Sequence, residues 1–70
     1  MTLNTAILRD LASGQSTASA VADRLRIAVS HAESILQRHE TDGLVTHSYI
    51  GAVSPNPLKV YRLTDKAIQQ

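Results

Sequence analysis

Short polar and charged side chains recur at the spacing of one helix face between residues 28 and 42. When the apolar Ala32, Ile35 and Leu36 are placed inward, a step of about 100° per residue turns these polar residues outward. The outward set is Ser30, Ser34, Gln37 and Thr41, flanked by Glu33 on one side and by His31 and Arg38 on the other. Glutamine can hydrogen-bond an adenine edge at two points, serine can bond either kind of base, and arginine can bind guanine or a phosphate. The face therefore suits contact with base edges, although every amphipathic helix also has a solvated face.

Further charged residues lie before, within and after this segment. Arg26 falls in a short turn just ahead of it, where it could meet a phosphate. Lys59, Arg62 and His47 fall in two later runs and could contact a sugar-phosphate backbone beside the helix. Alternatively, lysine and arginine on an exposed strand protect its edge and keep it soluble. Glu33 would repel phosphates but could accept a hydrogen bond from a cytosine amino group.

The sequence gives little support for metal binding or catalysis. His31, His39 and His47 are spaced by eight residues, whereas two ligands on one helix turn need a spacing of three or four, and the chain has no cysteine. The three glycines are isolated, so there is no phosphate-binding glycine loop, and no nucleophile turn is recognisable. The two tyrosines give no stacking platform for single strands. We therefore expect no enzyme, no metal and no cofactor, and a duplex is the better nucleic-acid partner.

Two helices are predicted ahead of this segment. Leucines at helical spacing indicate the first over residues 3–13, with Gly14 where a C-cap belongs. The second is expected over residues 17–25, with Ser16 as its N-cap. Its apolar residues are mostly small or β-branched, which favours close helix contact, while Arg24 faces outward as a surface charge.

The third helix carries the polar face. After a turn at residues 26–27 it is predicted over about 28–42, and Gly43 ends it. Ala28 extends its buried stripe at the start and His39 extends it at the end, as a partly buried substitute for an apolar residue.

A change of pattern marks a hairpin after the third helix. Residues 44–50 and 58–63 are rich in β-branched and aromatic types, and the glycine, prolines and asparagine of 51–57 cannot continue a strand. Tyr61 and Leu63 share one strand face and are expected in the core between hairpin and helices.

The chain is predicted to end in a short helix over residues 65–70, capped by Thr64. The element order therefore predicts an α+β fold: a three-helix bundle, a two-stranded hairpin and a short last helix, all in one domain over residues 1–70.

Two stretches carry a family resemblance. The segment from Leu25 to Val45, which ends in Glu40-Thr41-Asp42-Gly43-Leu44-Val45, resembles the helix-turn-helix core of bacterial winged-helix regulators, including MarR-like proteins. The segment Val60-Tyr61-Arg62-Leu63-Thr64-Asp65-Lys66-Ala67 is similar to the end of the wing and the following helix of the same families. The resemblance covers nearly the whole chain, and its size suits a small regulator of bacterial or phage type.

The resemblance implies a sequence-specific duplex-DNA-binding transcriptional regulator. It places a recognition helix, about 28–42, in the major groove and a wing, about 44–63, on the DNA backbone. The residues expected to contact DNA are Val29, Ser30, His31, Glu33, Ser34, Gln37, Arg38, Arg26, Lys59 and Arg62.

Three residues depart from the family pattern. Arg26 stands where the turn usually has glycine, and a left-handed backbone there would cost on the order of 1 kcal/mol. Ala28 replaces the usual serine or threonine cap of the recognition helix and cannot accept a hydrogen bond from its free N–H groups. His39 stands where a leucine is common. These departures concern the geometry of the turn and leave the predicted fold unchanged.

Length and charge limit the partners. The 70 residues are 43% hydrophobic with a formal net charge of +1, and no apolar run approaches the roughly 20 residues that span a bilayer. We expect a cytoplasmic protein with no signal peptide, no membrane partner and no evident small-molecule ligand. Few phosphates can be neutralised, which predicts a homodimer or a larger DNA-bound protein partner.

The alternative is a protein–protein interaction module, for which near-neutral charge is natural. A folded surface that gathers Arg26, Arg38, Lys59 and Arg62 on one side would favour DNA. A surface of mixed charge would favour the interaction module.

Overall fold

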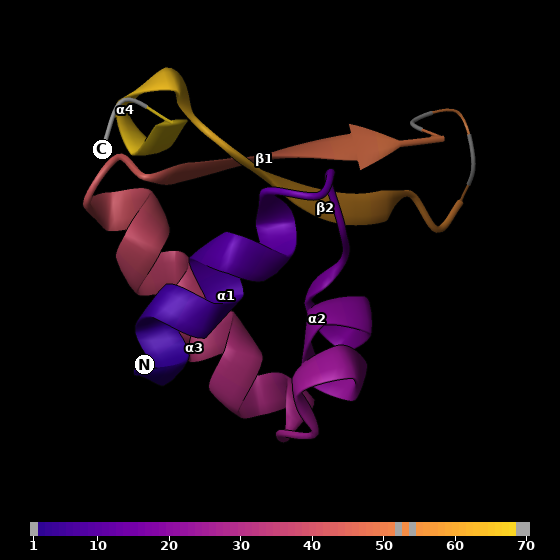
Figure 1. Cartoon of the computed structure of the whole chain (residues 1–70). Helices are drawn as coiled ribbons and strands as arrows, with labels where there is room; N and C mark the ends of the chain where they lie inside the picture. Colours follow the sequence, from indigo (N-terminus) through magenta and orange to yellow (C-terminus); the bar gives the residue numbers. More distant parts are fainter. Residues whose placement is uncertain (1, 52, 54, 69–70) are drawn as a thin grey trace.

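Three helices form a bundle, and a two-stranded hairpin lies along one side of it in the computed structural model (Figure 1). The structure describes residues 2–51, 53 and 55–68. Its elements are α1 (Leu3–Leu11), α2 (Ala18–Leu25), α3 (Val29–Thr41), β1 (Val45–Ile50), β2 (Leu58–Leu63) and α4 (Asp65–Ile68). The predicted α+β class and element order are confirmed. No helix in the described part of the chain is long and apolar enough to cross a membrane.

Helix α1 is shorter than predicted. Thr2 caps its start by accepting a hydrogen bond from the Thr5 N–H at 3.3 Å. It ends at Leu11 rather than at residue 13, with Ala12 as the C-cap in a right-handed conformation. Gly14 is therefore not the C-cap of α1, contrary to the prediction from the sequence. It lies two residues further on with a φ of +142°, in the turn that leads the chain back towards β2.

Helix α2 is capped by Thr17 and not by Ser16, so that prediction was wrong. The Thr17 hydroxyl accepts the Ala20 N–H at 3.0 Å. Ser16 instead pairs with β2: its N–H donates to the Tyr61 carbonyl at 3.0 Å, and its carbonyl accepts the Tyr61 N–H at 2.7 Å. This tertiary pairing fixes Ser16 in an extended conformation one residue ahead of the cap, and the entry to α2 is tied to the hairpin.

At the turn between α2 and α3, Arg26 adopts the left-handed conformation that is costly for a residue other than glycine. Arg26 has φ 57° and ψ 48° and, among the described residues other than glycine, is the one with positive φ. The next N–H, that of Ile27, returns to the Ala22 carbonyl at 3.0 Å, which closes α2 with a Schellman-type pair of bonds. The turn geometry thus selects this conformation despite the cost of a side chain there.

Replacement of Arg26 by glycine is expected to raise the free energy of unfolding by about 1 kcal/mol, because glycine adopts positive φ without steric strain. The measurement is urea unfolding followed by circular dichroism. Arg38→Gly is the matched control: it removes the same side chain from inside α3, where glycine should lower the free energy of unfolding by about 1 kcal/mol. Equal destabilisation by both substitutions would contradict the account of the turn.

Helix α3 begins at Val29 and ends at Thr41, one residue inside each predicted limit. Ala28 is its N-cap and makes no side-chain cap bond. It is exposed, so its predicted place in the buried stripe was wrong. Gly43, with φ +79°, follows the C-cap Asp42, and the Leu44 N–H then bonds the His39 carbonyl at 2.9 Å. The prediction that Gly43 ends the helix is confirmed, because Gly43 directly follows the C-cap and turns the chain away from α3.

The core lies where the helices meet the base of the hairpin. Strands β1 and β2 are antiparallel, in register from Val45 opposite Leu63 to Ile50 opposite Leu58. Tyr61 is 2% exposed and Leu63 packs partly buried against the core, as predicted. The central buried cluster consists of Ile7, Leu11, Ala18, Val21, Ile35, Leu36, Val45 and Tyr61. Burial of these residues fixes α3 and the hairpin relative to each other.

His39 is buried beside this core, 6% exposed. Its Nε2 lies 3.0 Å from the Asn4 carbonyl of α1, which requires the Nε2–H tautomer to donate there. Its Nδ1 has no partner in the described part of the chain. The predicted role of His39 as a replacement for an apolar residue is consistent with this position.

Thr64 joins the end of the hairpin to the end of α3. Its hydroxyl donates to the Gly43 carbonyl at 2.6 Å, its N–H donates to the Leu44 carbonyl at 3.0 Å, and the hydroxyl also lies 3.4 Å from the Ala67 N–H. Its predicted capping position is confirmed, and α4 is described as far as Ile68. Residues 69 and 70 of the predicted last helix lie outside the described residues.

Candidate nucleic-acid interface

The outward face of α3 is polar and solvent-exposed. This face consists of the exposed residues Val29, Ser30, His31, Glu33, Ser34, Gln37, Arg38 and Thr41. Ala32, Ile35 and Leu36 face the core beneath them. The division of α3 into a buried stripe and a polar face is therefore the one predicted from its spacing.

Three separate elements converge beside this face. A shallow groove of about 290 Å³ lies between the start of α2, the α3 face and the start of β2. Thr17 and Ser19 line it from α2, and Leu58 and Lys59 line it from β2. From α3 come Val29, Glu33 and Gln37. We call this the α3 groove. It brings a hydrogen-bonding helix face, a helix N-terminus and a cation together in one place.

Lys59 is the cation of the α3 groove. Its Nζ lies 5.1 Å from the centre of the Tyr61 ring, a distance at which a cation is attracted to the ring face. A hydrogen bond to the Tyr61 side chain raises the pKa of Lys59, and the charges of Tyr61, Tyr49 and Glu40 add to this, while desolvation opposes it. Lys59 therefore lies against the Tyr61 ring at the edge of the α3 groove.

His47 points towards α3 in the structure. Its Nδ1 pairs with Oε2 of Glu40, and its ring meets those of Tyr49 and Tyr61 edge-on, with centroids 5.7 and 6.2 Å apart. His47 was predicted as a possible contact to a DNA backbone. In this arrangement its Nδ1 is already engaged with a carboxylate, and the pair connects β1 to the end of α3.

Arg24 is a surface charge, as predicted, and it forms an ion pair with Asp10. Its Nε and Nη2 donate to the two carboxylate oxygens of Asp10 at 2.8 and 2.6 Å, and Nη2 also donates to the Ser16 hydroxyl at 2.6 Å. The hydrogen bond to Asp10 raises the pKa of Arg24. The pair bridges α1 and α2 and removes one cation from the set available to phosphates.

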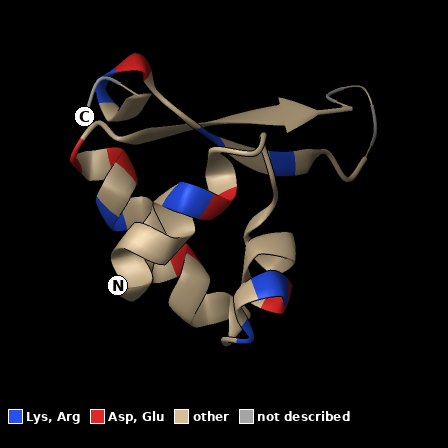
Figure 2. Cartoon of the chain, in the orientation of Figure 1, with Lys and Arg blue, Asp and Glu red and all other residues tan. Residues whose placement is uncertain are grey.

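The remaining predicted cations are spread over the molecule. Arg26 is exposed at the turn and Arg38 is exposed on one flank of α3. Arg62 does not line the α3 groove; it lies with Arg9 beside a different hollow, between α1, β2 and α4. Figure 2 shows blue and red segments interspersed along the helices, and Lys59 and Arg62 line different hollows. By the criterion set from the sequence, the surface is one of mixed charge.

Thr17, Ser19 and Leu58 belong to the α3 groove and were not among the predicted site residues. Residues 17–25 had been interpreted only as a packing helix, and Leu58 only as part of a strand. The signal that could have found Thr17 and Ser19 is their position at the N-terminus of the helix before the turn, where free N–H groups attract anions. In the described part of the chain, no three histidine, aspartate or glutamate residues are grouped so as to hold a metal ion.

No family model and no curated protein sequence matches the chain. Solved structures do match it. A variant of Lactococcus lactis ZitR in complex with DNA aligns with a TM-score of 0.82 and 24% identity, over 99% of this chain and 47% of that one. Bacillus subtilis PadR in complex with operator DNA aligns with a TM-score of 0.82 and 23% identity, over 96% and 42%. The homodimeric winged helix-turn-helix DNA-binding domain Mb0332 of Mycobacterium bovis, a possible ArsR-family transcriptional regulator, aligns with a TM-score of 0.80 and 24% identity, over 94% and 57%.

The chain has the winged helix-turn-helix fold. Helices α2 and α3 with the Arg26 turn form the helix-turn-helix, and β1 and β2 form the wing. The fold that the sequence resemblance implied is thereby confirmed. The chain spans about half the length of the ZitR and PadR chains that it matches.

Proposed function

We propose that this winged helix-turn-helix chain binds duplex DNA as a transcriptional regulator, with α3 in the major groove and the wing against the backbone. The observation that carries the proposal is the convergence of the start of α2, the polar face of α3 and Lys59 of the wing around one groove. The DNA complexes of the similar ZitR variant and PadR support it. On this basis the chain acts by occupying a site and not as an enzyme.

The dimensions of α3 suit a major groove. Its 13 residues give a rod of roughly 20 Å, and the major groove, about 12 Å wide, admits one helix. Ser34 and Gln37, near the middle of the exposed face, are the proposed readers of base edges. Lys59, Arg26 and the free N–H groups at the start of α2 are the proposed contacts to phosphates.

Two copies, or one copy beside a larger DNA-bound protein, are proposed to act together. The formal net charge of +1 and the Arg24–Asp10 pair leave few cations for phosphates, so one domain gains little affinity from counterion release. A dimer doubles these contacts on a repeated or palindromic site. We place its action in the cytoplasm of a bacterial cell, where such regulators meet DNA.

A protein-docking role is the second candidate, and the mixed charge of the surface favours it. Glu33 and Lys59 both line the α3 groove, and Glu40 pairs with His47 nearby. Such alternation of charge suits a protein partner better than it suits the phosphates of DNA, which Glu33 would repel.

The experiment that separates the two is fluorescence anisotropy with two labelled duplexes, the chain's own upstream region and a random sequence, at several salt concentrations. Binding of the upstream duplex with an affinity that falls as salt rises, and a clear advantage over the random duplex, is expected. No binding of either duplex at low salt, with the protein folded, would overturn the proposal in favour of docking.

Lys59→Ala is expected to weaken binding of both duplexes by a similar factor and to reduce the slope of log affinity against log salt by about 1, because one phosphate contact is lost. The measurement is the same anisotropy series. Lys66→Ala is the control, since Lys66 lies on α4 and donates to the Asp42 carbonyl at 2.8 Å, away from the α3 groove. An unchanged slope for Lys59→Ala would show that the wing makes no phosphate contact at this residue.

A further inference from the structure

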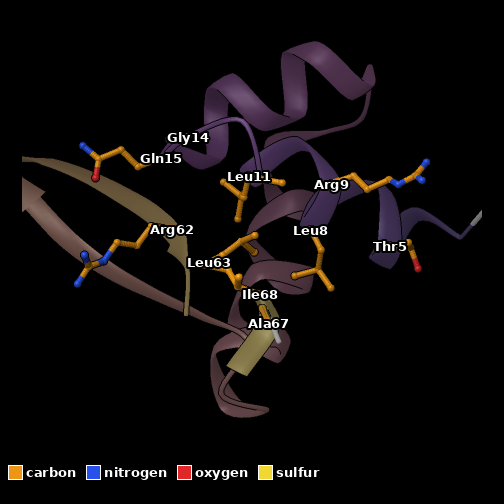
Figure 3. Close-up of a pocket in the computed structure, with 11 residues that line it drawn as sticks. Thr5, Leu8, Arg9, Leu11, Gly14, Gln15, Arg62, Leu63, Ala67 and Ile68 are labelled. Atoms are coloured by element: carbon orange, nitrogen blue, oxygen red, sulfur yellow. The ribbon is translucent and has the colours of Figure 1, made fainter. Parts of the chain in front are cut away.

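A second hollow lies between α1, the end of β2 and α4, away from the residues of the α3 groove (Figure 3). Its volume is about 730 Å³, and its surface is largely aliphatic. Leu8 and Leu11 come from α1, Leu63 from β2 and Ile68 from α4. Ile68 is 68% exposed and Leu8 is only partly buried. The hollow, which we call the α1–α4 groove, therefore presents apolar side chains to solvent.

Two guanidinium groups flank this apolar surface. Arg9 and Arg62 line the groove from α1 and β2, and in Figure 3 they extend from opposite ends of it. None of the described residues that line it is acidic. Asp10, the neighbour of Arg9 in sequence, is bonded to Arg24 instead. Among the described residues, no carboxylate pairs with Arg9 or Arg62. The groove therefore combines an apolar floor with two cations that no carboxylate of the described residues pairs with.

The charges argue against a second copy of the chain on this surface. In a symmetric dimer each patch meets itself, so Arg9 and Arg62 of one protomer would face the same two cations of its partner. Like charges brought together in an interface cost free energy and disfavour that pairing. An occupant that carries carboxylates on both sides of an apolar stripe would instead form favourable ion pairs with Arg9 and Arg62.

We propose that the α1–α4 groove binds an acidic amphipathic helix of another protein. The aliphatic residues of the helix would lie on Leu8, Leu63 and Ile68, and carboxylates along its flanks would pair with Arg9 and Arg62. A helix supplies an apolar stripe and flanking charges over several turns, which is the helix-in-groove mode of recognition. The occupant must extend far enough to reach two arginines at opposite ends of the groove.

This surface is independent of the proposed DNA contacts. No residue lines both the α1–α4 groove and the α3 groove. The chain can therefore hold DNA and an acidic helix at the same time, which would let it recruit a partner to a DNA site. The proposal goes beyond the proposed function, and it stands if the chain binds no DNA.

The test uses two fluorescein-labelled helical peptides of about 18 residues, long enough to form helix on binding. Both carry leucines at i, i+3, i+4 and i+7; one has glutamates flanking the leucine stripe and the other has lysines. Anisotropy titrations measure their affinities for the folded chain. The wild-type chain is expected to bind the glutamate peptide at least tenfold more tightly than the lysine peptide.

The Arg9→Glu/Arg62→Glu double variant is expected to reverse this preference. Lys66→Glu is the control, because Lys66 lies on α4 but does not line the groove. It should leave the glutamate peptide preferred. Changes in the amide NMR shifts of the wild-type chain should locate the glutamate peptide at Leu8, Arg9, Leu63 and Ile68. This measurement does not depend on whether the double variant folds.

Three results would overturn the proposal. They are the absence of binding by either peptide, an equal affinity for both, and NMR shifts confined to residues outside the α1–α4 groove. A double variant that folds, as judged by circular dichroism, and still prefers the glutamate peptide would also overturn it.

Discussion

Leu36→Ala is expected to lower the free energy of unfolding by about 2–5 kcal/mol. Leu36 is 0% exposed and lies in the cluster where α3 meets α1, α2 and the hairpin. Truncation leaves a cavity that the surrounding helices fill only partly. A 70-residue domain has a total stability of only roughly 3.5–10 kcal/mol, so this single change removes a large share of it.

Thermal unfolding followed by circular dichroism measures this effect. A loss of about 3 kcal/mol corresponds to a fall in Tm of roughly 12–24 °C for a domain of this size. Leu58→Ala is the matched control: Leu58 is 53% exposed on the wing, and its truncation should change Tm by only a few degrees. Equal effects of the two substitutions would show that α3 is not held to the bundle as described.

Gln37→Ala is expected to reduce discrimination between the upstream duplex and a random duplex by roughly 5- to 150-fold, since a good pair of hydrogen bonds to a base is worth about 1–3 kcal/mol. Gln37 lies directly after Leu36 in the chain but on the exposed face of α3, beside the α3 groove. Its loss should leave Tm nearly unchanged, because no core contact is removed. Anisotropy with both duplexes gives the ratio of affinities.

Gln15→Ala is the matched control for Gln37→Ala. Gln15 is also exposed, but it lies in the loop after α1 and lines the α1–α4 groove. Its truncation should leave both DNA affinities unchanged. If neither Gln37→Ala nor Ser34→Ala changes the ratio of the affinities for the upstream and the random duplex, the proposal that the middle of α3 reads base edges is wrong.

Local signals in the sequence were sufficient to predict the elements and the polar face of α3. Apolar periodicity located the three helices, and β-branched runs with a proline-containing turn located the hairpin. Gly43 correctly marked the end of α3, whereas the left-handed conformation of Arg26 was not predicted. Each of these signals depends on neighbours within a few residues, where backbone geometry and side-chain period act directly.

Features that depend on distant residues could not be predicted. Ser16 and Thr17 are both good N-caps in isolation, and only the pairing of Ser16 with Tyr61 decides between them. The Arg24–Asp10 ion pair joins α1 and α2 through two residues that are fourteen positions apart in sequence. Lys59 and Arg62 are close in the chain, yet alternation along β2 and the packing of α1 and α4 place them beside different grooves.

The most direct test of the central claim is to locate the DNA on the protein by amide NMR. The labelled chain is titrated with its upstream duplex, and shift changes are assigned residue by residue. The account predicts that they concentrate at the start of α2, along the exposed face of α3 and at Lys59. Shifts confined to α1 and α4, or no shifts at a saturating DNA concentration, would contradict it.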